Sequence, residues 1–105
     1  MIIRIWYGYT KPENAIQYQE LLKEEVFMGI AAKEVKGYRG IELIKRELED
    51  EVEFITIMRF EELKDVKDFA GENYQEAYVP QKARLLLKRY DATAQHYEQQ
   101  ILINY

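Results

Sequence analysis

The chain of 105 residues contains no cysteine. Without thiols it has no disulfides, no thiolate nucleophile, no iron–sulfur ligands and none of the usual structural zinc sites. It also has a single histidine, which excludes a multi-histidine metal site within one protomer. We therefore expect no metal or other cofactor. A chain of this length buries roughly two-thirds of its unfolded surface, which is enough for one domain with its own core.

Long apolar runs and an excess of basic residues are also missing. The first residues, Met1–Trp6, do not form a basic stretch followed by a long apolar run. We expect neither a signal peptide nor a membrane span, and a cytoplasmic protein without membrane partners. The net charge is −4, with acidic and basic residues mixed along the chain. Because no positive surface is available to neutralise phosphates, we expect no nucleic-acid partner.

Two prolines and five glycines leave long uninterrupted segments, and the first half of the chain predicts a strand followed by a helix. Alternating large side chains predict a strand over Ile2–Tyr9, with both faces at least partly buried. Thr10 and Glu13 then match the T-x-x-E pattern of a capping box, with Pro12 in the first helical turn. We expect the helix to run to about Gly29 or a little beyond. Its inward residues are Ala15, Tyr18, Leu22, Val26 and Ile30.

The second half predicts two strands, a helical region and a last strand. The strands cover residues 38–48 and 52–60, and the acidic residues at 49–51 and 53 are expected to lie in a solvated hairpin. A short helix over residues 62–70 ends at Gly71, and Pro80 opens another helical stretch with Ala83, Leu86 and Leu87 inward. The fourth main strand is expected at residues 90–98.

This order indicates an α+β domain of the ferredoxin-like βαββαβ type over residues 1–98, with an antiparallel sheet. Such a sheet has helices on one face only, yet the strands carry large apolar residues on both parities. A second copy of the chain is the simplest cover, so we expect a homodimer. The tail, residues 99–105, is too apolar for a free end and is expected to pack on that dimer. RNA-recognition domains share this topology, but the third strand here opens on Glu51 and Glu53, which argues against that function.

Several stretches resemble an uncharacterised branch of the antibiotic-biosynthesis monooxygenase family, over roughly residues 2–98. They read IIRIWYGYTKPENAIQY, GYRGIELIKREL, EVEFITIMRFEEL, FAGENY, VPQKARLLL and AQHYE. The resemblance implies a dimeric α+β barrel, in which two sheets pack face to face and each protomer keeps a pocket between its sheet and its helices. Relatives in the family include oxygenases that use dioxygen without metal or flavin.

Other relatives degrade haem, and the chain departs from their pattern. They need an asparagine on the first strand, a tryptophan on the helix of the second half and a histidine iron ligand soon after it. Here the corresponding places hold Trp6 and Tyr7, Phe69, and Tyr78. We therefore do not expect haem degradation, although a phenolate is chemically able to bind haem iron.

His96 is the main candidate for chemistry, because histidine is the side chain that titrates nearest neutral pH. It is interpreted either as a general base or as a residue that makes an ordinary hydrogen bond at a surface or interface. The aromatic side chains around it are interpreted either as a ligand pocket or as plain packing. The candidate residues are His96, Tyr7 and Tyr78 for catalysis, and Trp6, Tyr9, Phe69 and Tyr74 for substrate binding.

Three arginines, Arg4, Arg39 and Arg59, lie on predicted strands, where an unpaired charge is costly. Each is expected to meet a carboxylate across the sheet or the dimer, with anion binding as the alternative.

Two hypotheses for the function remain open. The first is a cofactor-independent monooxygenase acting on a small phenolic, quinol-like or anthrone-like substrate. The second is a non-catalytic homodimer that binds a small apolar or aromatic ligand, or a protein partner.

Overall fold

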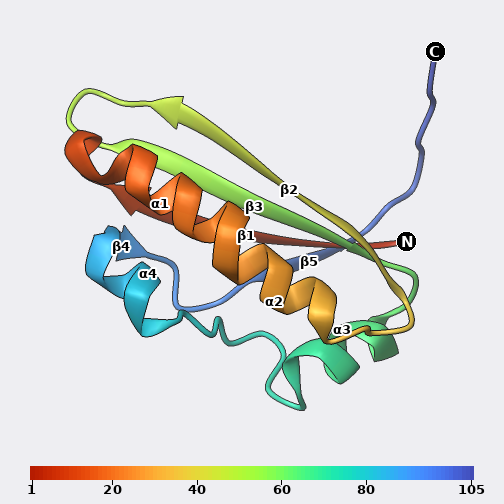
Figure 1. The fold of residues 1–105 in the computed structure, drawn as a ribbon. Coiled ribbons are helices and arrows are strands. Elements are labelled where there is room, and N and C mark those ends of the chain that lie inside the picture. Colours follow the sequence, from red (N-terminus) through yellow and green to blue (C-terminus); the bar gives the residue numbers. More distant parts are fainter.

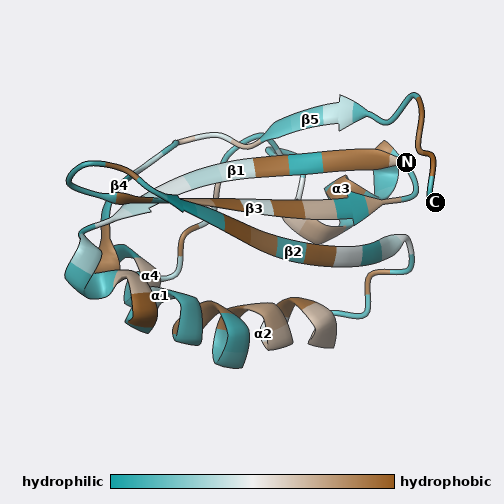
Figure 2. Cartoon of the chain, turned by 90° about the horizontal axis from the view of Figure 1, so that it is seen from above, coloured by the Kyte–Doolittle hydropathy of each residue, from teal (hydrophilic) through white to brown (hydrophobic).

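The strands form one five-stranded antiparallel sheet, and the helices lie on one of its faces (Figure 1 and Figure 2). The computed structural model describes residues 1–105. The strands are β1 (Ile2–Thr10), β2 (Tyr38–Glu47), β3 (Val52–Phe60), β4 (Leu87–Tyr90) and β5 (Gln95–Glu98). Their order is β2-β3-β1-β4, and β5 pairs with β1 further along the same edge. The α+β class expected from the sequence is therefore confirmed.

The first helical region is longer than its individual segments, because it continues through a π-helical turn. A 3-10 turn at Pro12–Asn14 leads into α1 (Ala15–Leu21), the π-helical Leu22–Val26 and α2 (Phe27–Ala32). This agrees with the helix predicted to reach Gly29 or beyond. The second half contains α3 (Leu63–Ala70) and α4 (Gln81–Leu86). No helix combines the length and the apolar character needed to cross a membrane.

Two clusters of buried side chains join the helices to the sheet. In the first, Tyr18 and Leu22 pack against Val52 and Phe54, and the rings of Tyr18 and Phe54 meet edge to face with centroids 4.9 Å apart. In the second, Val66 of α3 packs against Met58 and Phe60 at the other end of β3. The helix-facing side of the sheet thus supplies the core.

The opposite side of the sheet, which we call the open sheet face, carries a second set of apolar side chains. Side chains alternate along a strand, so the residues between the core positions point away from the helices. Ile5 of β1 lies opposite Ile57 of β3, and Tyr7 lies opposite Ile55. The apolar residues of the open sheet face are Ile3, Ile5, Tyr7, Tyr9, Ile44, Ile55 and Ile57. No helix of the chain covers them (Figure 2).

The capping box predicted at Thr10 and Glu13 is wrong. Thr10 is the last residue of β1 and is completely buried, and its hydroxyl has no hydrogen-bond partner. The following turn has Lys11 at its N-cap without a side-chain hydrogen bond, although Pro12 does occupy the first turn as expected. A capping box occurs instead at α3, between Glu62 and Asp65. Pairing of β1 with β3 and β4 holds Thr10 in the sheet, which outweighs the local capping pattern.

The last predicted strand, residues 90–98, is also wrong in its bounds, because the chain pairs with β1 in two separate pieces. Leu87, expected to be helical, begins β4, and its side chain still packs on the core. Between β4 and β5 the backbone turns toward the segment before α4. There Ala77 donates its amide to Ala92, and Ala94 donates to Gln75. These bonds compete with continuous pairing and divide the strand.

The acidic hairpin is not solvated as a whole. Glu51 and Glu53 are each only 7% exposed, whereas Glu49 and Asp50 are exposed. Burial of two carboxylates requires cationic partners, which the tertiary structure supplies from β2 and β4.

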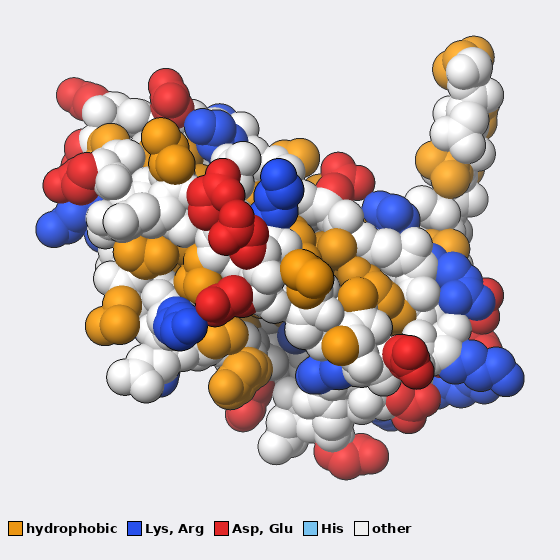
Figure 3. Space-filling model, in the orientation of Figure 1, with side chains coloured by type: hydrophobic (Ala, Val, Ile, Leu, Met, Phe, Trp, Pro, Cys, Tyr) orange, Lys and Arg blue, Asp and Glu red, His pale blue; other side chains and the backbone are white.

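The C-terminal residues leave the body of the protein (Figure 1), and several hydrophobic side chains lie along them (Figure 3). Gln99 still donates its amide to Met1. Beyond it, Ile101 is 80% exposed, Leu102 66% and Ile103 64%. The packing of this tail on a second copy stays a prediction.

Candidate functional site

An open cavity of about 430 Å³ lies beside the edge strand β5. Its walls are formed by Ile2, Leu63, Tyr74, Gln75 and residues 93–98. Ligand sites in proteins commonly have volumes of about 300–1,000 Å³ and combine apolar walls with a few polar groups. The cavity is thus large enough for a small organic molecule.

His96 lines this cavity and forms a hydrogen bond with Arg4. The two residues lie opposite each other on β5 and β1, and Nη1 of Arg4 is 2.9 Å from Nε2 of His96. A guanidinium only donates hydrogen bonds, so Nε2 accepts and the imidazole is neutral. Burial lowers the pKa of His96, and the positive charge of Arg4 lowers it further.

Arg4 is buried without a carboxylate. It is 8% exposed, and its other hydrogen bond runs from Nη1 to the backbone oxygen of Tyr74 at 2.5 Å. Its Cζ lies 5.8 Å from the ring centroid of Phe69, a distance that allows a cation–π contact. Burial lowers the pKa of Arg4. The other two strand arginines have the expected carboxylates, since Arg39 pairs with Glu61 and Arg59 with Glu42. Arg4 has no carboxylate partner within the chain.

Tyr74 lies next to His96 in the lining of the cavity. Their rings meet edge to face with centroids 5.1 Å apart. The irregular segment that follows Tyr74 is tied to the β4–β5 connection by the bonds of Gln75 and Ala77 described above and by a bridge between Glu76 and Thr93. These contacts keep the tyrosine wall close to the histidine.

The remaining predicted site residues lie in three other places. Trp6 donates its indole N–H to the backbone oxygen of Asp91 at 2.8 Å and packs on Tyr90. Tyr7 and Tyr9 are on the open sheet face, on the opposite side of β1 from Arg4. Tyr78 is 87% exposed. The structure therefore brings His96, Tyr74 and Phe69 together around Arg4. It leaves Trp6, Tyr7, Tyr9 and Tyr78 away from this group.

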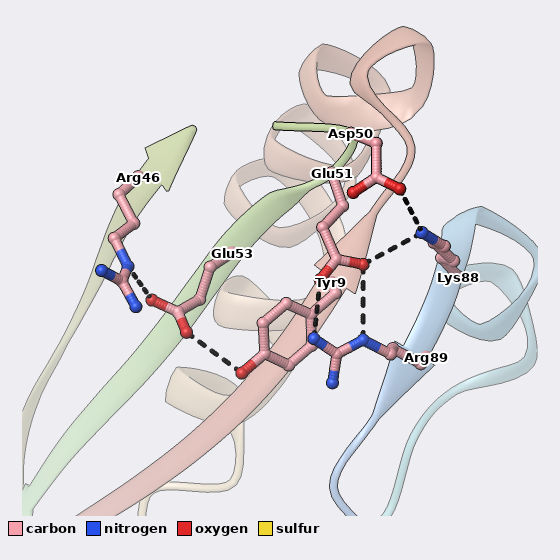
Figure 4. A network of polar contacts seen from close by, with 7 residues as sticks. All are labelled: Tyr9, Arg46, Asp50, Glu51, Glu53, Lys88 and Arg89. Atoms are coloured by element: carbon pink, nitrogen blue, oxygen red, sulfur yellow. Dashed lines mark hydrogen bonds and ion pairs between the residues drawn. The ribbon is translucent and has the colours of Figure 1, made fainter. Parts of the chain in front are cut away.

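A second polar constellation, which we call the charged end of the sheet, was missed in the sequence (Figure 4). Glu53 lies between two donors, accepting from Arg46 Nε at 2.6 Å and from the Tyr9 hydroxyl at 3.0 Å. The hydrogen bond from Arg46 lowers the pKa of Glu53. The signal for this pair was present, because Arg46 and Glu53 lie directly opposite each other across the hairpin.

Glu51 forms the other half of the charged end. It accepts from Arg89 Nη2 at 2.6 Å and forms an ion pair with Lys88 at 3.2 Å, and the hydrogen bond from Arg89 lowers its pKa. Arg89 in turn lies over the ring of Tyr9, with Cζ 3.6 Å from the centroid. Every charge of this constellation has a partner, so it ties four strands and the hairpin together and leaves no group free for a ligand.

The sequence was also compared with known proteins. No model of a known protein family matches the chain, and a search of curated proteins finds no similar one. The resemblance to the monooxygenase family therefore remains a prediction that depends on the sequence motifs alone.

The structure offers no cluster of metal ligands. No group of three or more histidine, aspartate or glutamate side chains is arranged to hold a metal ion. The residues of the cavity can instead supply aromatic and apolar contacts, one ring N–H of His96 and the nearby positive charge of Arg4. Sequence reasoning identified His96 and Tyr74 but expected a carboxylate for Arg4, because the register between β1 and β5 is not visible in the sequence.

Proposed function

We propose that this protein is a homodimeric monooxygenase that acts on a small phenolic, quinol-like or anthrone-like substrate without metal or flavin. One observation carries the proposal, namely the cavity of about 430 Å³ whose lining includes the neighbouring rings of Tyr74 and His96. Aromatic lining residues bind a flat substrate, and the ring N–H of His96 donates a hydrogen bond that stabilises the substrate oxygen as it loses its proton.

The reaction needs little from the protein beyond binding and proton control. Loss of a proton to water converts the substrate into a phenolate or carbanion, which passes an electron to dioxygen. For an anthrone-like substrate, a CH₂ group becomes a C=O group. One oxygen atom enters the product, and the other leaves as water with the two hydrogens of that carbon.

The homodimer and the ferredoxin-like barrel belong to the same proposal. The strand order β2-β3-β1-β4, with helices on one face, supports a ferredoxin-like arrangement. The open sheet face is apolar in its middle, and near its ends the charged groups pair with one another, as Arg46 does with Glu53 and Arg59 with Glu42. An apolar centre with a polar rim is typical of protein interfaces. Two such faces packed together form the dimeric α+β barrel.

A second candidate function is a non-catalytic homodimer that binds a small aromatic ligand. It is favoured by one observation, because Nε2 of His96 already accepts a hydrogen bond from Arg4 and is not free to take a proton. Both candidate functions use the same cavity. Only the first converts the bound molecule into a product.

Dioxygen uptake tests the proposed reaction. Purified protein is mixed with a panel of hydroquinones and anthrones, and oxygen consumption is recorded with an electrode. The wild type and the His96→Ala variant are measured in the same way. We expect turnover with at least one compound and a loss of roughly 10²–10⁴-fold in the variant. Binding of panel compounds without oxygen uptake would contradict the monooxygenase and support the second candidate.

A further inference from the structure

We propose that Arg4 holds the ring of His96 as a neutral hydrogen-bond donor toward the cavity, and that the cavity therefore selects planar ligands in their anionic form. This inference deepens the proposed function. It rests on that function in one respect only, namely that the ligand of the cavity is also the substrate. Arg4 is a positioning residue in this inference, because it contacts His96 and Tyr74 but does not itself line the cavity.

The first step follows from the donor inventory of the two side chains. Arginine stays protonated in proteins and has no acceptor, so the 2.9 Å contact requires a lone pair on Nε2 of His96. A neutral imidazole carries one N–H, which must then be on Nδ1. In this geometry His96 can donate a hydrogen bond to a ligand oxygen but cannot accept a proton on Nε2.

The second step concerns the groups that surround His96. Arg4 faces it from β1, and Tyr74 faces it from the segment after α3. Lys67 of α3 lies over the ring of Tyr74, at 5.7 Å, and adds a second positive charge nearby. On β5, Tyr97 and Glu98 also line the cavity. A proton on His96 would place two positive charges in contact, so the neutral ring is favoured, in agreement with the lowered pKa.

The third step is the charge balance of the site. Arg4 is buried and forms no ion pair, although a buried charge is normally paired. A ligand oxygen with a negative charge, bound to the Nδ1 hydrogen of His96, would supply the missing partner through the ring. Glu98 is the one acidic residue in the cavity wall, and it opposes this selection. Phenolates and aromatic carboxylates fit both the rings and the charge.

The tautomer can be measured directly, because the chain has a single histidine. Nitrogen NMR of protein labelled at the histidine ring then shows one pair of ring signals that needs no assignment to a residue. We expect the proton on Nδ1 at neutral pH in the wild type. In Arg4→Met we expect loss of this single tautomer and titration closer to the ordinary value of 6.5. A proton on Nε2 in the wild type would overturn the inference.

The charge selection is tested with two probes of the same shape, 2-naphthoate and the neutral 2-naphthamide, by calorimetry. We expect the wild type to bind naphthoate at least about tenfold more tightly, and Arg4→Met to lose this preference by on the order of 10- to 100-fold. Glu98→Gln is the matched variant on the exposed side of the cavity. It should strengthen naphthoate binding about two- to fivefold and leave naphthamide unchanged.

The outcomes separate this inference from the proposed function. Equal affinity for the two probes, or binding of neither, overturns the inference even if oxygen uptake occurs. Selective binding of naphthoate with no oxygen uptake supports the inference and removes the monooxygenase. If Arg4→Met does not fold, the wild-type tautomer and the Glu98→Gln variant still decide the question.

Discussion

The hydroxyl of Thr10 is a buried polar group without a partner. Its residue is 0% exposed, and its Oγ1 makes no hydrogen bond. Such a group loses its hydration on folding without compensation. We expect Thr10→Val, which keeps the shape and the β-branched side chain, to raise the free energy of unfolding by about 1–2 kcal/mol. Urea unfolding measures this change, and a destabilised variant would indicate that the hydroxyl is satisfied in solution.

Three titrating residues predict how stability depends on pH. The pKa of His96 is lowered from 6.5, so below that value the unfolded chain binds a proton before the folded chain does. Stability therefore falls as pH drops below about 6.5. The pKa values of Glu51 and Glu53 are lowered from 4.5, so their contribution is complete above that value and is lost as pH falls through their folded values. Acid should thus destabilise the protein in two stages.

Unfolding midpoints in urea, measured across the pH range, check this prediction. His96→Asn should abolish the first stage, which begins below pH 6.5, and leave the second, which begins below pH 4.5, in place. A first stage that persists in the variant would assign it to another group.

At the scale of elements, the start of α3 depends on a glycine that is distant in the sequence. Asp65 accepts the backbone amide of Glu62 at 3.0 Å, and a Cβ on Gly37 would overlap its carboxylate. We expect Gly37→Ala to displace this cap and to lower the free energy of unfolding by about 1–2 kcal/mol.

The matched control is Gly29→Ala on α2, where a Cβ meets nothing within 4 Å. Alanine favours a helix over glycine, so this variant should gain about 0.5–1 kcal/mol. Thermal unfolding of the two variants should therefore shift in opposite directions. Equal shifts would contradict the role given to Gly37.

The C-terminal tail is exposed to solvent beyond Gln99. Residues 100–105 are all exposed, and they include Ile101, Leu102 and Ile103. Because this apolar surface is predicted to pack on a second copy, deletion of residues 100–105 should weaken dimerisation and lower the melting temperature. Analytical ultracentrifugation across a concentration series measures the first effect. An unchanged dissociation constant and melting temperature would show that the tail does not pack there.

At the scale of the whole molecule, the open sheet face predicts an obligate homodimer with an interface of at least about 1,600 Å² in total. Ile5 and Ile57 lie opposite each other near its centre. A lysine at either place should break the dimer, because a charge buried in an apolar interface has no partner. Ile16→Lys is the control, since Ile16 is 77% exposed on the helical side.

Sedimentation distinguishes the outcomes. The wild type and Ile16→Lys should be dimers at micromolar concentration, and Ile57→Lys should be a monomer with retained circular dichroism. A stable wild-type monomer would contradict the prediction.

Local patterns determined most of the elements. The alternation of large side chains identified β1, β2 and β3. The range predicted for β3, residues 52–60, matches the structure. Helical spacing identified the long first helix, and Gly71, with φ of 90°, ends α3 as expected. These signals are local, since each depends on residues a few positions apart. The division of the last strand was not predictable, because it depends on hydrogen bonds between residues 92–94 and residues 75–77.

The candidate site was decided by the tertiary structure. The sequence alone identified His96 and Tyr74 as chemical groups, but the register of β5 on β1 places His96 beside Arg4 and on the other side of the strand from Tyr7. A shift of one residue would have reversed that outcome, because successive side chains point to opposite faces. Likewise, the burial of Glu51 depends on Arg89, which reaches it from a distant part of the chain. The sequence by itself determines which reactive side chains this chain carries and on which strands they lie. The register between the strands determines which of these side chains contact one another.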